Sequence, residues 1–99
     1  MDHDHPNPWI AGLATEDLAF LKRFILLSGS LKALAEEYGI SYPTIRLRLD
    51  RLIEKIKLLD SREIPTEFER RVRILCAEGR IDPAAMNAIL TAYRKEKSR

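Results

Sequence analysis

A helix end and a helix start lie only a few residues apart near the middle of the chain, and this spacing constrains the fold more than any other feature. Leu31, Leu34 and Ala35 recur at helical spacing, which predicts a short amphipathic helix ending near Tyr38. Gly39 follows at once, and glycine suits the left-handed backbone found just past a helix end. The chain is therefore expected to turn sharply at this glycine.

A second helix is predicted to begin directly after the turn. Ser41 can accept a hydrogen bond from a free backbone N–H, and Pro43 lies in the first turn, where a missing N–H costs little. We therefore expect a helix over residues 42–56, with one broad apolar face turned to the core. That face consists of Ile45, Leu49, Leu52, Ile53 and Ile56.

Two helices joined in this way are typical of a helix-turn-helix unit. Ala35 in the first helix, with Gly39 four residues later, would let the helices cross closely, and branched residues would fill the crossing. The stretch SGSLKALAEEYGISYPTIRLRLDRLIEKI, residues 28–56, resembles the helix-turn-helix of a bacterial family of unknown function. It is similar in style to the DNA-reading region of sigma factors and many small repressors. The resemblance covers residues 18–57 best and implies a DNA-binding regulator.

Longer members of the family that the chain resembles carry a cysteine-rich zinc ribbon ahead of the helices. Here Cys76 is the only cysteine, so the chain cannot form a four-cysteine zinc site. His3 and His5 lie in an N-terminal stretch whose prolines are expected to forbid a helix as far as Pro8, and we predict no metal site there. Trp9 is expected to anchor this tail to the core or to a second chain, in preference to stacking on a ligand.

Further helices are predicted on both sides of the helix-turn-helix. One is expected to start with Thr15 as its N-cap and to end near residues 28–29. After residue 57 the chain shows neither alternating strands nor a glycine turn, so we predict no wing. A helical hairpin should follow: one helix from Thr66 or the preceding proline to Gly79, and another starting at Pro83.

The predicted fold class is therefore all-α, with a three-helix helix-turn-helix core followed by a C-terminal helical hairpin. We divide the chain into an N-terminal tail with a tryptophan anchor (1–14), the helix-turn-helix domain (15–58) and the hairpin (59–99), which packs on that domain or on a partner chain. Ninety-nine residues suffice for one domain without metals or disulfides.

Charge is distributed unevenly along the chain, although the net charge is only +2. Residues 41–58 carry five basic and two acidic side chains, while residues 1–40 carry three basic and six acidic ones. Basic charge concentrated on the second helix favours contact with nucleic acid. The alternative is that these cations only solvate the helix and pair with Asp50 and Glu54. The predicted DNA-binding residues are Ser41, Tyr42, Thr44, Arg46, Arg48 and Arg51.

Within this set, Arg48 and Arg51 are long enough to reach base edges, while the hydroxyl-bearing residues suit phosphate oxygens. Five basic residues on the helix would give a salt slope of at most about −4.5 per chain.

Apolar residues on outward faces suggest a second chain. Leu47 and Leu58 lie on the outer side of the predicted reading helix. Alternatively, Leu47 would contact a thymine methyl and Leu58 the C-terminal hairpin. We expect these surfaces to form the interface of a homodimer. The candidate interface residues are Trp9, Leu47, Leu58, Met86 and Tyr93.

The sequence offers little for other functions. It has no activated nucleophile, no glycine-rich phosphate loop and no legible pocket, so we expect no enzyme activity, cofactor or small-molecule ligand. No apolar run is long enough for a bilayer, and a cytoplasmic location is expected. The leading hypothesis is a transcriptional regulator that reads double-stranded DNA with residues 42–56. The alternative is a protein-interaction module that uses the same fold without binding DNA.

Overall fold

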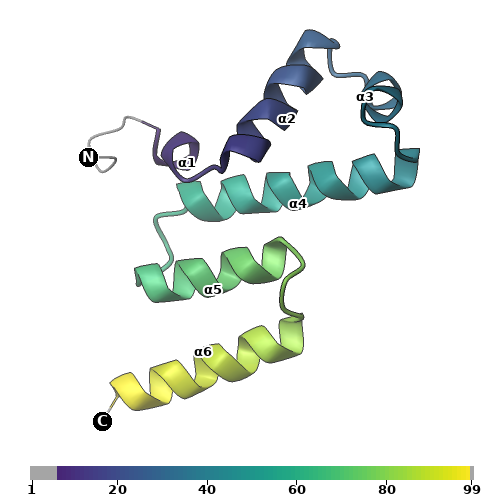
Figure 1. Ribbon diagram of the computed structural model, residues 1–99. Coiled ribbons are helices and arrows are strands. Elements are labelled where there is room, and N and C mark those ends of the chain that lie inside the picture. The colour runs from purple at the N-terminus through teal and green to yellow at the C-terminus, as the bar shows by residue number, and fades with distance from the viewer. Residues whose placement is uncertain (1–6, 99) are drawn as a thin grey trace.

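The structure, a computed structural model, describes residues 7–98, and this part of the chain forms six helices and no strand (Figure 1). The prediction of an all-α fold is confirmed, and no wing follows the helix-turn-helix within these residues. The helices are α1 (Pro8–Ala11), α2 (Thr15–Leu26), α3 (Leu31–Tyr38), α4 (Tyr42–Asp60), α5 (Glu67–Ala77) and α6 (Pro83–Lys97).

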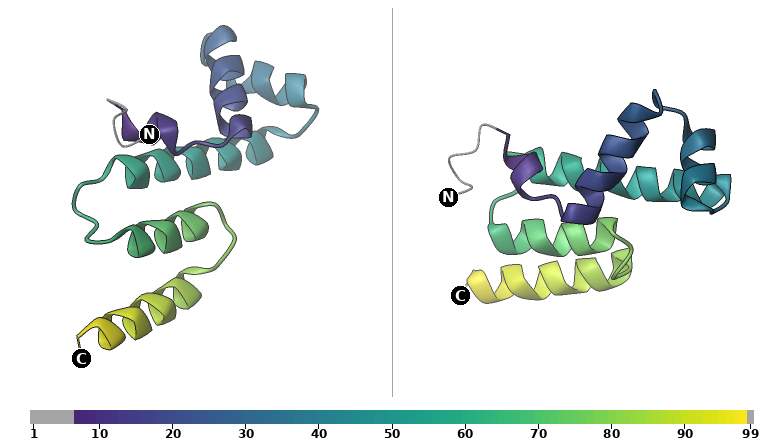
Figure 2. Two further views of the ribbon diagram at one scale, coloured as in Figure 1. Left: turned by 60° about the vertical axis from the view of Figure 1, so that its left-hand side comes forward. Right: turned by 45° about the horizontal axis from the view of Figure 1, so that its top comes forward.

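The long helix α4 lies at the centre of the molecule. Helices α1, α2 and α3 lie on one side of it, and α5 and α6 follow in turn on the other (Figures 1 and 2). Helix α5 packs along α4, and α6 packs against α5. The molecule is elongated as a result, with extents of 52 × 33 × 18 Å.

The helix-turn-helix core forms where α2, α3 and α4 meet. Phe20, Leu34 and Ile45 are almost completely buried there. Ile53, which the apolar pattern assigns to the core, is 38% exposed, so that part of the prediction is wrong. It follows Leu52 by about 100° around the helix, and this places it at the edge of the apolar face.

The turn between α3 and α4 forms as the sequence indicates. Gly39 has the left-handed backbone that ends α3, with φ of 67°. The Ser41 hydroxyl then accepts a hydrogen bond from the backbone N–H of Thr44, 3.3 Å away, and α4 begins at Tyr42. These local contacts fix the position of the first turn of α4.

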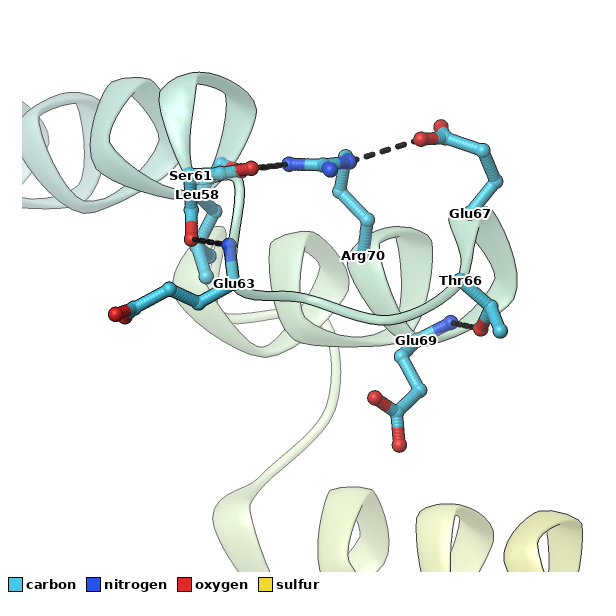
Figure 3. Close-up of polar contacts among 7 residues, drawn as sticks. All are labelled: Leu58, Ser61, Glu63, Thr66, Glu67, Glu69 and Arg70. Atoms are coloured by element: carbon cyan, nitrogen blue, oxygen red, sulfur yellow. Dashed lines mark hydrogen bonds and ion pairs between the residues drawn. The ribbon is translucent and has the colours of Figure 1, made fainter.

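Helix α4 continues to Asp60, about one turn beyond the predicted residues 42–56. The additional helical turn at the end of α4 is contacted by a side chain of α5. The Arg70 guanidinium donates hydrogen bonds to the backbone oxygens of Leu58 and Ser61, and it pairs with Glu67 at 3.0 Å (Figure 3). Carbonyls at a helix end have no partner within the helix, so a side chain from α5 stabilises the end of α4.

The N-terminal region differs from its prediction at two points. Pro8 is the first residue of α1 rather than part of a non-helical tail, because a proline N–H is not needed at that position. The N-cap of α2 is Ala14 rather than Thr15, and the Asp17 carboxylate accepts a hydrogen bond from the Ala14 N–H at 3.1 Å. Trp9 packs against the helix-turn-helix core. The predictions for His3 and His5 lie outside the described residues.

The C-terminal hairpin contains three buried apolar residues, Val72 and Ile74 of α5 and Leu90 of α6. The rings of Phe68 and Tyr93 stack between its two helices, with centroids 4.3 Å apart. The predicted start of the second helix is confirmed, since Asp82 caps α6 and Pro83 is its first residue.

Lys55 joins the hairpin to the helix-turn-helix. Its ammonium Nζ lies 2.7 Å from Asp17 of α2 and 2.8 Å from Glu78 at the end of α5. The residue is only 8% exposed. Burial by itself lowers the pKa of Lys55, but hydrogen bonds and charge attraction from both carboxylates outweigh it and raise this pKa above its ordinary value.

Candidate nucleic-acid interface

The first half of α4 presents an uncovered outward surface. Tyr42 and Leu47 are 52% and 48% exposed, although both are large and apolar. Five of the six predicted DNA-binding residues are exposed on this half of the helix, and Arg48 is half-buried. The exposed five are Ser41, Tyr42, Thr44, Arg46 and Arg51.

The hydroxyl groups of Ser41 and Thr44 form a pair at the start of α4, with their oxygens 2.8 Å apart. Two hydroxyls have two protons, and only one of them can lie between the two oxygens. The other O–H remains able to donate to an external acceptor such as a phosphate oxygen. Because the helix N-terminus also favours negative charge, this end of α4 suits an anion.

Arg46 and Arg51 lie on opposite flanks of the outward surface, about 140° apart around the helix axis. Arg46 contacts Asp50 through an exposed ion pair of 3.3 Å, and such a pair is weak enough to exchange for another anion. Arg51 lies instead against Gly79, in the turn between α5 and α6. A Cβ at Gly79 would come within 2.6 Å of the Arg51 guanidinium.

Arg48 takes a different position from the other arginines of α4. Its guanidinium lies 4.8 Å from the ring centroid of Phe20 and 5.0 Å from that of Tyr38, which places it against the core between α2 and α3. Cation–π contacts of this kind stabilise both the charge and the packing. Replacing Arg48 would therefore disturb the fold as well as any contact with DNA.

A hollow of about 370 Å³ lies beside this surface, between α4, α2 and the α5–α6 turn. Thr44, Leu47 and Arg51 line it from α4, and Arg80 lines it from the turn. Arg48 also borders the hollow, so three arginines surround one concave site.

Lys55 cannot serve as a phosphate contact, although it was counted among the five basic residues of the predicted helix. Its ammonium group is buried between Asp17 and Glu78. The estimate of about −4.5 for the salt slope of α4 is therefore too large, and the four remaining cations give at most about −3.6 per chain.

Most predicted interface residues have partners within the chain. Trp9 packs on the helix-turn-helix core, and Tyr93 stacks on Phe68. Leu58 and Met86 are half-buried, and Leu58 lines the seam between α4 and the hairpin. The remaining candidate is Leu47, which stays exposed on the outward surface of α4.

Arg80 is a candidate DNA-contacting residue that the sequence did not predict. The turn that carries it comes close to α4 only because α5 packs along that helix. The sequence contains one local signal, the glycine at position 79, because a glycine in a turn often marks a close approach between two parts of the chain. In the structure Gly79 has a positive φ of 78°.

Residues 13–59 match the model of a family described as "Domain of unknown function (DUF2089)-HTH". This stretch is therefore similar to the helix-turn-helix domain of a family of unknown function, as the resemblance in its sequence predicted. The matched stretch contains α2 and α3 and nearly all of α4, while the hairpin lies outside it. No curated protein and no solved structure matches the chain.

None of the helices in residues 7–98 is long and apolar enough to cross a membrane. The cysteine and acidic side chains of that region do not gather in threes as a metal ion would require.

Proposed function

We propose that this protein is a DNA-binding transcriptional regulator that inserts the first half of α4 into the major groove and acts in the cytoplasm without catalytic activity. The observation that supports this most is the uncovered surface of α4, which combines hydroxyl groups, arginines and one apolar side chain on a helix-turn-helix unit. Recognition helices of this class contact bases mainly through their N-terminal residues.

The chemistry of the surface supports a division of contacts. Ser41 and Thr44 would donate to a phosphate oxygen, while Arg46 and Arg51 would reach the two edges of the groove. Leu47 lies between these arginines and would contact a thymine methyl group.

Acidic residues limit how much of α4 enters the groove. Asp50 and Glu54 are exposed further along the same helix. Carboxylates repel phosphates, so the part in contact with DNA would end near Leu47, with Arg51 at its margin. This limit favours insertion of the helix by its N-terminal end.

We also propose a homodimer, because a short reading surface gives each chain few base contacts. Two copies related by a two-fold axis would read an inverted motif, with half-sites about 34–36 Å apart along the duplex.

The proposal is tested by selecting duplexes from a random pool with the purified protein and sequencing those that bind. We expect enrichment of an inverted motif with half-sites one helical turn apart, or a multiple of it. The Arg46→Ala variant should bind the selected duplex more weakly and make the slope of log K against log salt less negative by about 0.9 per chain, as expected for one lost phosphate contact. Arg62→Ala is the matched control, because Arg62 is exposed in the linker at the other end of α4. Equal affinities for Arg46→Ala and Arg62→Ala would remove Arg46 from the interface, and an unenriched pool would contradict sequence-specific reading.

A protein-interaction module is the second candidate, and exposed apolar side chains favour it. Ile25 and Leu26 at the end of α2 are 70% and 71% exposed. An apolar partner would bind with little dependence on salt, whereas phosphate contacts weaken steeply as salt rises. Salt titration therefore separates the two functions.

A further inference from the structure

We propose that the turn between α5 and α6 is a second DNA-contacting element, in which Arg80 binds the phosphate backbone alongside α4. This inference rests on the proposed function, since it assigns an additional contact to the same partner. It also gives the C-terminal hairpin, which lies outside the matched helix-turn-helix stretch, a direct part in binding.

The hollow beside α4 has the position that this role requires. Thr44, Leu47 and Arg51 belong both to the lining of the hollow and to the exposed surface of the helix. A helix in the major groove has a sugar–phosphate strand along each edge of that groove, which is about 12 Å wide. A concave site directly beside the inserted helix therefore faces one of these strands.

The charges around the hollow favour a polyanion. Its lining includes four cations, Arg48, Arg51, Lys55 and Arg80, and two carboxylates, Asp17 and Glu78. Lys55 contacts both carboxylates at 2.7 and 2.8 Å. These three groups together carry a net charge of −1, so the three arginines leave the site with +2.

Arg80 is available for a new contact. Its side chain is 71% exposed, and its ion pair with Glu78 is 3.4 Å long. A long pair in which the arginine is largely exposed contributes little to stability. Glu78 would keep Lys55 as its partner if Arg80 moved to a phosphate oxygen.

The turn is held beside α4 by two contacts that involve neighbouring residues. Lys55 binds Glu78, and the Arg51 guanidinium lies against Gly79, where a side chain would collide with it. Arg80 follows directly, so its backbone is positioned before any DNA binds. A preplaced arginine loses less conformational entropy on binding than one on a free loop.

The test measures how DNA affinity depends on salt for the full-length protein and its Arg80→Gln variant, by fluorescence anisotropy with a labelled mixed-sequence duplex. We expect Arg80→Gln to make the slope of log K against log salt less negative by about 0.9 per chain, the value for one lost phosphate contact. Affinity should fall by a similar factor for selected and unrelated duplexes, because phosphates carry no sequence information.

Two further variants complete the design. Arg62→Gln removes the same charge from an exposed position in the α4–α5 linker and should leave the slope unchanged. The double variant Arg51→Gln with Arg80→Gln should reduce the slope by about 1.8 per chain. Circular dichroism would verify that each variant keeps the helix content of the wild type.

The outcomes separate this inference from the proposed function. If the wild type binds DNA and Arg80→Gln has the same slope as Arg62→Gln, the role of the turn is overturned while the reading role of α4 stands. If the wild type does not bind duplex DNA even at low salt, both are overturned.

Discussion

Lys55 is the residue through which the helix-turn-helix and the C-terminal hairpin are joined. It lies on α4, binds Asp17 of α2 and Glu78 at the end of α5, and is almost buried. Two carboxylates at the ends of different helices would repel each other without the ammonium between them. The position of the α5–α6 turn, and hence of Arg80, therefore depends on this lysine.

Replacing Lys55 with methionine should lower the free energy of unfolding by about 2 to 3 kcal/mol, because it leaves two partly buried carboxylates without their cation. Urea denaturation of the purified variant measures this difference. Lys57→Met is the matched control, since the Lys57 side chain is 69% exposed and its pair with Glu54 is 3.4 Å long. We expect the control to change stability by less than about 0.5 kcal/mol.

The stabilisation that Lys55 provides should also depend on pH. The pKa of Lys55 is raised in the folded state, so its contribution is complete below the unfolded-state value of about 10.4. It is lost as pH rises through the higher folded-state pKa. The stability difference between the wild type and Lys55→Met should therefore be constant near neutral pH and shrink above about pH 10.4. A difference that grows with alkaline pH would contradict the assigned ion pairs.

At the scale of single helices, the end of α4 is held by a side chain from outside it. Arg70 of α5 donates to the carbonyl oxygens of Leu58 and Ser61 (Figure 3). Arginine can reach two acceptors at once because its donors are arranged in a fixed plane, and lysine lacks this geometry. This contact explains how α4 continues past the residues that the sequence predicts.

Arg70→Ala should destabilise the protein by about 1.5 to 3 kcal/mol, the range for lost hydrogen bonds with a charged donor. Amide hydrogen exchange should increase most in the last turn of α4. Arg71→Ala serves as the control, since Arg71 is the exposed neighbour of Arg70 on α5. If both variants unfold at the same urea concentration, Arg70 does not cap α4.

The sequence predicted the helix ends well because helix starts and stops depend on residues that are close together in the chain. Gly39, Ser41 and Asp82 act on backbone groups within three or four residues, and each ends or starts a helix as expected. Arg80 and Lys55 escaped prediction because their roles depend on which helices pack together. Periodicity likewise assigned Ile53 to the core, since it cannot determine how far a neighbouring helix covers an apolar face.

For the candidate site, the sequence located the outward residues of α4 but not their surroundings. Arg48 was predicted to reach bases, whereas its guanidinium stacks on Phe20 and Tyr38. Aromatic partners from two other helices could not be inferred from spacing along α4 alone.

The whole molecule is elongated, with α4 between two groups of helices (Figure 2). The outward surface of α4 near Tyr42 remains uncovered, while α5 packs along α4 and places its own C-terminal turn beside Arg51. This arrangement leaves one concave, basic margin next to an exposed helix end. Its partner, on the proposed function, is a DNA duplex.

The salt dependence of duplex binding tests this proposal most directly. Wild-type protein would be titrated into a labelled duplex at about 50 and 200 mM salt, and the dissociation constants compared by anisotropy. Arg46, Arg48, Arg51 and Arg80 predict a slope of about −3 to −4 per chain, so affinity should fall roughly 100-fold for one bound chain, and roughly 10⁴-fold for the proposed dimer, over this fourfold change. Absence of binding at the lower salt concentration, or affinity that does not change with salt, would contradict the assignment of α4 as a DNA-reading helix.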